Sequence, residues 1–213
     1  MPRSSIATAA VLTLLALAGC ARSGDILSTG ILATYNACPP AAIPAPAGDV
    51  TLFNPAESRD SNAIDVVATI TNLRGSCVAS GDRLVTNASF DVFALRRDNR
   101  GARDVVLPYF ATVVQSGTNV VSKRRGQVVV RFADGSFRGQ AASTATSSVA
   151  ASAATLPQNI RRLITAERRA GDPNAALDPL SDPAVRQAVE QARFELLVGF
   201  ELTADQLRYN ATR

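Results

Sequence analysis

Residues 127–136, Gln-Val-Val-Val-Arg-Phe-Ala-Asp-Gly-Ser, decide the fold class of this 213-residue chain. Val128, Val130 and Phe132 fall on one face of an extended segment, and the residues between them fall on the other. The Asp134-Gly135 pair that follows is a favoured tight-turn sequence. The stretch therefore predicts a half-buried β-strand that ends in a hairpin turn over residues 133–136.

The same two-residue alternation recurs along most of the chain. It covers residues 64–70, 84–95, 105–114 and 194–202, with polar loops or glycine-containing turns between the segments. Short strands separated by turn signals are typical of antiparallel sandwiches. We therefore predict an all-β fold, an antiparallel β-sandwich of about seven strands that is similar to immunoglobulin or fibronectin domains.

Details of this pattern carry separate predictions. Residues 73–77 and 122–125 are expected to be turns, and Pro108 is expected at a sheet edge or bulge, because proline cannot donate a ladder hydrogen bond. Residues 140–155 consist almost entirely of Ala, Ser, Thr and Val. Two interpretations stay open for this segment, a low-complexity linker and a strand of small residues, and its Thr and Val content favours the strand.

A helical insertion is expected late in the chain, at about residues 156–192. Leu156-Pro157 opens a segment with apolar residues at helical spacing, and Ser181-Asp182-Pro183 is typical of a helix start. A short helical turn is expected after Thr203. The whole folded domain is expected to span residues 50–213.

The composition excludes several kinds of chemistry. The chain has no His, and its single Lys is Lys123, so the usual general base and the commonest metal ligand are missing. Ser122 and Lys123 are adjacent and would point to opposite faces of a strand, so they form no catalytic dyad. Three Cys cannot build a four-thiolate zinc site. We expect no enzyme activity, no metal and no cofactor.

Acidic residues offer two weaker alternatives. Asp60 and Asp65 are candidates for a carboxylate pair of the kind that glycosidases use. Asp172, Asp178 and Asp182 could supply oxygen ligands to calcium. These three lie among prolines, where Asp is favoured in turns and helix caps, so we expect structural roles for them.

Residues 1–19 have the pattern of an export signal, with Arg3 followed by an uncharged run that is shorter than the about 20 residues of a membrane span. The next stretch, Leu17-Ala18-Gly19-Cys20, resembles the lipobox of bacterial lipoproteins. This resemblance implies cleavage before Cys20 and acylation of its thiol and new amino group, which would anchor the protein in a membrane. Ala21 then favours the outer membrane, facing the periplasm. The alternative is an ordinary export signal with an unrelated Cys.

Residues 20–49 are expected to form the lipidated Cys and a tether. Four prolines between Cys38 and Pro46 favour an extended polyproline II spacer. With Cys20 acylated, Cys38 and Cys77 remain in an oxidising compartment, and their even number predicts a disulfide. The alternative is a pair of free or redox-active thiols, although the chain has no Cys-x-x-Cys motif that would activate a thiolate.

Two further stretches carry a second resemblance. Leu107-Pro108-Tyr109-Phe110 and residues 198–203, Val-Gly-Phe-Glu-Leu-Thr, resemble a pattern in envelope lipoproteins of alphaproteobacteria. The resemblance implies a lipoprotein of the bacterial cell envelope. It implies no particular activity.

The charge of the chain argues against nucleic acid as a partner. The net charge is +4, and removal of Arg3 with the signal would leave +3, spread along the sequence. We predict a non-enzymatic, membrane-anchored module that docks a protein partner or supports an assembly in the periplasm. The predicted partner contacts are the basic residues of the first predicted helix, Arg161, Arg162, Arg168 and Arg169. The alternatives are a module that binds glycan or another envelope ligand, which three Tyr and no Trp disfavour, and a hydrolase.

Overall fold

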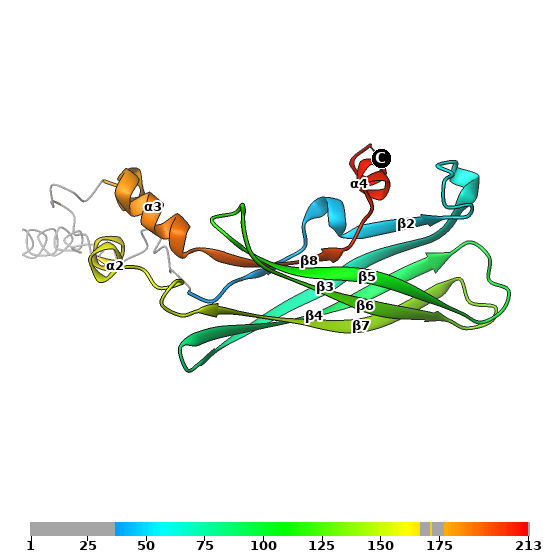
Figure 1. Ribbon diagram of the computed structural model, residues 1–213, viewed down its shortest axis with the longest axis horizontal. Coiled ribbons are helices and arrows are strands. Elements are labelled where there is room, and N and C mark those ends of the chain that lie inside the picture. The colour runs from blue at the N-terminus through cyan, green and yellow to red at the C-terminus, as the bar shows by residue number, and fades with distance from the viewer. Residues whose placement is uncertain (1–36, 167–170, 172–176, 213) are drawn as a thin grey trace, which may run out of the picture.

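The computed structural model describes residues 37–166, 171 and 177–212 of the chain. Two four-stranded sheets pack face to face, and the helices α2 (Gln158–Thr165) and α3 (Pro183–Ala192) lie at one end (Figure 1). The first sheet has the order β2 (Asp49–Phe53), β3 (Ile64–Ser80), β4 (Arg83–Arg96), β7 (Arg138–Ala150). The second has the order β1 (Ala41–Ala42), β8 (Phe194–Phe200), β5 (Arg103–Gln115), β6 (Asn119–Phe132). The other helical elements are η1 (Ala45–Ala47), η2 (Ser61–Ala63), η3 (Pro179–Ser181) and α4 (Ala204–Thr212).

The predicted antiparallel β-sandwich is confirmed. All strand pairs are antiparallel except the short pair of β1 with β8. The core lies between the sheets, where alternate side chains of the long strands are buried. Its largest fully buried side chains are Phe90, Phe132, Phe200, Leu107 and Leu196.

The strand order differs from that of an immunoglobulin domain. There the first sheet follows the order A-B-E-D, whereas here β2, β3 and β4 lie side by side in sequence order. The chain turns at Asp134-Gly135, with Gly135 at φ 76°, but the predicted hairpin is wrong. This turn joins β6 of one sheet to β7 of the other, so it does not close a hairpin within a sheet.

The segment of small residues is a strand, which settles the choice left open by the sequence. β7 pairs with β4 over its full length with no register shift, from Arg138 opposite Leu95 to Ala150 opposite Arg83. Small side chains suit this position because the two sheets approach closely beside it. A Cβ added at Gly139 would lie 2.6 Å from the Val130 Cγ1 on β6.

Two predicted turns are wrong. Residues 73–77 continue β3, which bends by a register shift between Thr71 and Arg74 and reverses only at Gly81, where φ is 60°. Residues 122–125 lie inside β6, although they are charged. Residues 122–125 are exposed on both faces of an edge strand, so their polarity did not distinguish strand from turn. In residues 73–77, Leu73 and Cys77 are half-buried against the core, and the polar Arg74, Gly75 and Ser76 between them resembled a turn.

Pro108 marks the end of a ladder, in agreement with its expected place at an edge or bulge. Its carbonyl accepts a hydrogen bond from the Glu201 N–H at 2.9 Å. The return bond is missing because proline has no N–H. The pairing of β5 with β8 therefore stops at Tyr109 opposite Phe200.

The helical insertion forms at the predicted place. The Asp182 carboxylate accepts from the Ala184 N–H at 2.8 Å and Pro183 occupies the first turn of α3, as the sequence indicated. α2 and α3 share a small apolar core of their own, separate from the core between the sheets. It contains Leu156, Ile160, Val185 and Ala192. The predicted turn after Thr203 is the helix α4.

The described part of the expected tether lies against the sandwich. β1 pairs with β8 through Ala41 opposite Leu196, and Ala47 is buried beside Gly199, where an added Cβ would lie 2.8 Å from the Ala47 Cβ. The extended backbone that the prolines favour is compatible with a short edge strand. From Ala37 onward the segment is therefore part of the fold and not a free spacer, whereas residues 1–36, with Cys20, lie outside the described residues.

The predicted disulfide joins Cys38 to Cys77, whose Cα atoms are 5.9 Å apart. Cys77 lies in β3 and not in the loop that the sequence suggested. The bond ties the start of the described chain to the strand that leads into the β3–β4 hairpin.

Candidate functional site

Two of the four predicted basic contact residues belong to the part of the chain that the structure describes. Arg161 and Arg162 lie on the exposed side of α2, opposite the buried Ile160. Arg168 and Arg169 lie outside the described residues. α2 is thus a short helix with an apolar inner side and two cations on its outer side.

A second group of basic residues, Lys123-Arg124-Arg125, is partly neutralised. Within β6, the Lys123 ammonium and the Arg125 guanidinium lie 3.8 Å and 2.7 Å from the Glu201 carboxylate. Lys123 also lies 5.3 Å from the centre of the Phe110 ring. Arg124 points to the opposite face of the strand, so the three residues do not form one cationic surface.

The acidic candidates have structural partners. Asp60 caps η2 through the Asn62 N–H, and Asp65 forms an ion pair with Arg103. Asp178 caps η3 in the way that Asp182 caps α3. Asp172 lies outside the described residues. Within the described ranges no three His, Cys, Asp or Glu side chains gather into a group that could hold a metal ion.

The pKa shifts of the described residues follow surface ion pairs. The hydrogen bond from Arg100 holds the pKa of the Asp98 carboxyl well below its usual value, and the Arg131 guanidinium lowers the pKa of Asp104 in the same way. Both pairs are exposed. These shifts stabilise the charged forms, so they do not prepare either carboxyl group to act as a general acid near neutral pH.

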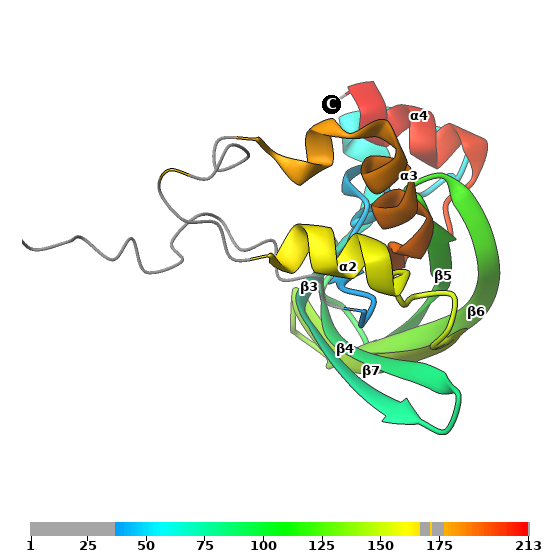
Figure 2. The ribbon, with the colours of Figure 1, turned by 90° about the vertical axis from the view of Figure 1, so that its left-hand side faces the viewer.

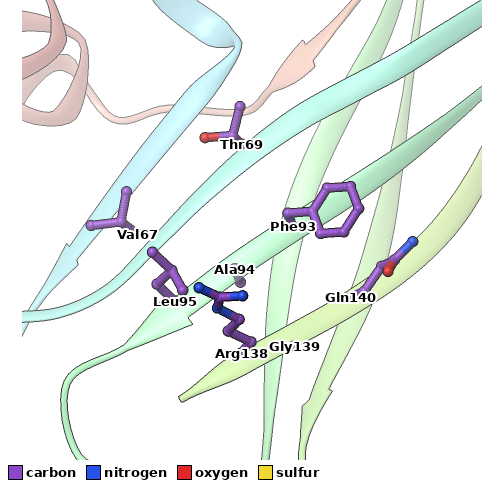
Figure 3. A pocket seen from close by; sticks show the side chains of 8 residues that line it. All are labelled: Val67, Thr69, Phe93, Ala94, Leu95, Arg138, Gly139 and Gln140. Carbon is purple, nitrogen blue, oxygen red and sulfur yellow. The ribbon is translucent and has the colours of Figure 1, made fainter. Parts of the chain in front are cut away.

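The outer face of the first sheet carries a shallow apolar hollow, which we call the β4 hollow (Figure 3). Val67, Phe93 and Leu95 line it with Arg138, together with smaller parts of β3 and β7. Phe93 is 49% exposed and Leu95 is 55% exposed, which is unusual for large apolar side chains in the middle of a sheet.

Arg138 supplies the charge of the β4 hollow. It stands opposite Leu95 in the strand register, and Figure 3 shows its side chain reaching toward Leu95. In the part of the chain that the structure describes, no acidic side chain forms an ion pair with Arg138. The hollow therefore combines exposed apolar surface with a cation.

The edge of β7 borders the same face. The carbonyl of Phe137 accepts from the Arg96 N–H, and the Ala151 N–H donates to the Asp82 carbonyl. The main-chain N–H and C=O groups of odd-numbered residues in this segment therefore point toward β4. The main-chain groups of even-numbered residues point away from the sheet. Some of these carbonyls have side-chain donors, because the Tyr109 hydroxyl donates to Thr144 and the Arg83 guanidinium donates to Ser148, both at 2.9 Å.

The β7 edge lacks the features that usually protect an edge strand. Among the described strands β7 pairs only with β4. Residues 139–150 contain no charge and no proline, and the strand has no bulge. Such an edge is a template for the addition of another strand.

The sequence indicated part of this surface. Its alternation placed Phe93 and Leu95 on the face opposite the core, and large apolar residues at such positions are the signal of an exposed patch. The hollow itself depends on β3 and β7 as neighbours of β4. Strand order was not predictable from the alternation.

In comparisons with known proteins, no family model, no curated protein and no solved structure matches this chain. The resemblances to lipoproteins therefore stay predictions. None of the helices in the described ranges is long and apolar enough to cross a membrane.

Proposed function

We propose that this protein is a non-enzymatic lipoprotein of the bacterial cell envelope that docks an extended segment of another envelope protein. The observation that carries the docking is the β7 edge, which has no charge over residues 139–150, together with the exposed Phe93 and Leu95 side chains of β4. Addition of a strand to such an edge is a common mode of peptide recognition, in which main-chain hydrogen bonds give affinity and side-chain pockets give specificity.

The envelope location rests on two features that support each other. The Leu17–Cys20 stretch fits a lipobox, and a disulfide between Cys38 and Cys77 is expected in an oxidising compartment. We therefore propose that residues 1–19 are removed and that acyl chains on Cys20 hold the protein at the outer membrane, facing the periplasm.

The β4 hollow suggests the chemistry of the docked segment. A strand added beside β7 would place alternate side chains on the outer face, next to the short side chains of Ala142 and Thr144. Phe93 stands opposite Gln140 in the register, so a large side chain beside the short Ala142 can reach Phe93 diagonally. Because Arg138 carries an unbalanced charge at the start of β7, the docked segment is expected to pair an apolar residue with a nearby carboxylate.

The docking proposal can be tested with proline at the edge. Ala142 is even-numbered, so its N–H points away from β4, and Ala142→Pro removes an edge donor without removing a ladder hydrogen bond. We expect native complexes captured from solubilised envelopes by the Ala142→Pro protein to lose a partner that the wild-type chain retains. Ala142→Ser keeps the N–H and is the matched control.

Equal capture by the wild-type protein and the Ala142→Pro variant would refute docking at this edge. The folding of both variants is checked by circular dichroism and by the absence of free thiols before reduction. A second variant, Phe93→Ser, removes apolar surface at an exposed position and should weaken capture of the same partner.

The anchor has its own test. Cys20→Ala removes the thiol that would be acylated, so the protein should lose its acyl mass and leave the membrane fraction. An unchanged mass and unchanged fractionation would contradict the anchor while leaving the docking test unaffected.

The alternative of glycan binding has less support. Tyr109 is buried in the sandwich, and Tyr209 packs edge-on against Phe53 with ring centres 5.1 Å apart. The buried Tyr109 ring therefore offers no face to a sugar. Tyr35 lies outside the described residues.

A further inference from the structure

The helical end of the molecule gathers exposed apolar and basic side chains. This end consists of α2, α3 and the tips of the β3–β4 and β5–β6 hairpins, and Figures 1 and 2 show these elements together. The Ala151 N–H donates to Asp82 at the first hairpin tip, and the Ser116 N–H donates to the Arg193 carbonyl after α3. We call the end of the molecule that these elements occupy the helical end.

Several large apolar residues are exposed there. They are Val78 near the first hairpin tip, Val120 and Val121 at the second, Leu163 on α2 and Leu177 before η3. Each of these side chains is at least half exposed. Apolar side chains on protruding tips and on a short amphipathic helix are typical of proteins that lie on a bilayer surface.

The charge of α2 suits an anionic surface. Residues 156–166 contain Arg161 and Arg162 and no acidic residue. Along the chain, Glu167 and Asp172 follow this segment but lie outside the described residues, whereas Asp178 and Asp182 accept hydrogen bonds from backbone N–H groups as helix caps. Leu163 adjoins the two arginines, so α2 presents cations and an apolar side chain together.

The path of the chain permits this end to face the membrane. The disulfide to Cys77 fixes Cys38 on β3, three residues before the strand ends at Ser80. Residues 20–37 then join the described chain to the proposed lipid anchor, and even fully extended they would reach at most about 60 Å. Of the two ends of the sandwich, the helical end lies nearer to the point where this segment enters.

We propose that the helical end rests on the anionic headgroup surface of the membrane, with Leu163 and the hairpin valines at the interface and Arg161 and Arg162 on lipid phosphates. The proposal rests on the anchor at Cys20 proposed above. It leaves the β7 edge and the β4 hollow, on the side of the sandwich, open to a protein partner.

Hydrogen exchange read by mass spectrometry tests this orientation on the full chain as the cell makes it. The protein is reconstituted in vesicles of phosphatidylcholine alone, and in vesicles of equal parts phosphatidylcholine and phosphatidylglycerol. We expect amides of residues 158–165 and of both hairpin tips to exchange at least about tenfold more slowly in the anionic vesicles, since each arginine at an anionic surface contributes about a factor of five. The loops at the opposite end, residues 97–102 and 133–137, should not change.

A double variant and a matched control separate charge at the helical end from charge in general. Arg161→Gln with Arg162→Gln should remove most of the protection of residues 158–165. Arg100→Gln with Arg131→Gln removes the same charge from exposed side chains at the opposite end, and it should leave the protection intact. Because all four side chains are exposed, none of these changes is expected to unfold the domain.

The outcomes distinguish this proposal from the proposed function. An acylated protein whose helical end exchanges equally fast in both vesicles overturns the orientation and keeps the anchor. If the helical end is protected in native envelopes but in neither kind of vesicle, where no other protein is present, a protein partner covers it. That result also overturns the proposal. An unacylated protein that still gains protection on anionic vesicles supports contact with lipid while it refutes the anchor.

Discussion

The ring of Tyr109 lies over Gly126 on the neighbouring strand, and the Tyr109 hydroxyl donates to the Thr144 carbonyl on the opposite sheet. A Cβ added at Gly126 would lie 2.5 Å from the Tyr109 Oη and 2.6 Å from Cε1. One side chain thus crosses from β5, beneath β6, to β7. It closes the side of the sandwich on which the two edge strands do not pair.

Gly126→Ala is expected to destabilise the fold. The new methyl group would displace the Tyr109 ring, which is buried and packs edge-on against Phe90 with ring centres 5.2 Å apart. Overpacking of this kind costs about 1–3 kcal/mol. Urea unfolding should show a lower midpoint with an unchanged slope, and Gln127→Ala, at the exposed neighbouring position, should stay within about 0.5 kcal/mol. Equal midpoints for the wild-type and Gly126→Ala proteins would contradict the close packing.

Thr86→Val is expected to stabilise the fold. The Thr86 and Ser147 side chains face each other across β4 and β7, and both hydroxyls are buried without a hydrogen-bond partner in the described structure. A buried hydroxyl of this kind costs about 1–3 kcal/mol, and valine has nearly the same shape. Thermal unfolding should show a higher midpoint.

The control for this prediction is an exposed threonine on the partner strand. Thr146→Val removes the hydroxyl that donates to Asn87 at 2.9 Å, so it should be neutral or destabilising. If both valine variants shifted the midpoint equally, β-strand propensity would explain the gain, and the buried hydroxyl would not.

Arg96 is expected to be essential for stability at the end opposite the helices. It is 4% exposed, and its guanidinium lies 5.2 Å from the centre of the Phe132 ring. Its guanidinium donates to the main-chain carbonyls of Asn99, Gly101, Ala133 and Ser136 at 2.7–2.9 Å. It therefore ties the β4–β5 loop to the β6–β7 turn.

Arg96→Met would keep the apolar packing and lose all four hydrogen bonds, so we expect a loss of about 3 kcal/mol or more in urea unfolding. Arg96→Lys should also lower the stability in urea unfolding, because an ammonium has only three donors and lacks the planar arrangement of guanidinium N–H groups. Arg97→Lys is the surface control. A full rescue by lysine would show that only the charge matters.

The sequence predicted the sandwich because the alternation of Val128, Val130 and Phe132 depends only on which side chains are buried. It also predicted α3 from Asp182 and Pro183, since capping is a local interaction. The β4 hollow, the β7 edge and the Arg96 carbonyl cluster were not predictable, because each is made by strands or loops far apart in the chain. Charged residues of β6 were mistaken for a turn, since the exposed end of an edge strand has the polarity of a loop.

The Cys38–Cys77 disulfide is expected to act on the folded chain as well as on the unfolded one. The chain-entropy model for a loop of this length predicts a loss of about 4 kcal/mol when both cysteines are replaced by serine. In the folded protein the bond also holds the segment whose Pro40 carbonyl accepts from the Leu196 N–H at 2.8 Å. In the Cys38→Ser, Cys77→Ser protein, hydrogen exchange at the Leu196 amide should therefore speed up by more than the fall in the free energy of unfolding explains. Exchange at the Val198 amide should speed up only by the amount that this fall explains. If the two amides changed alike, the disulfide would act through the unfolded chain alone, and β1 would hold its place on β8 without it.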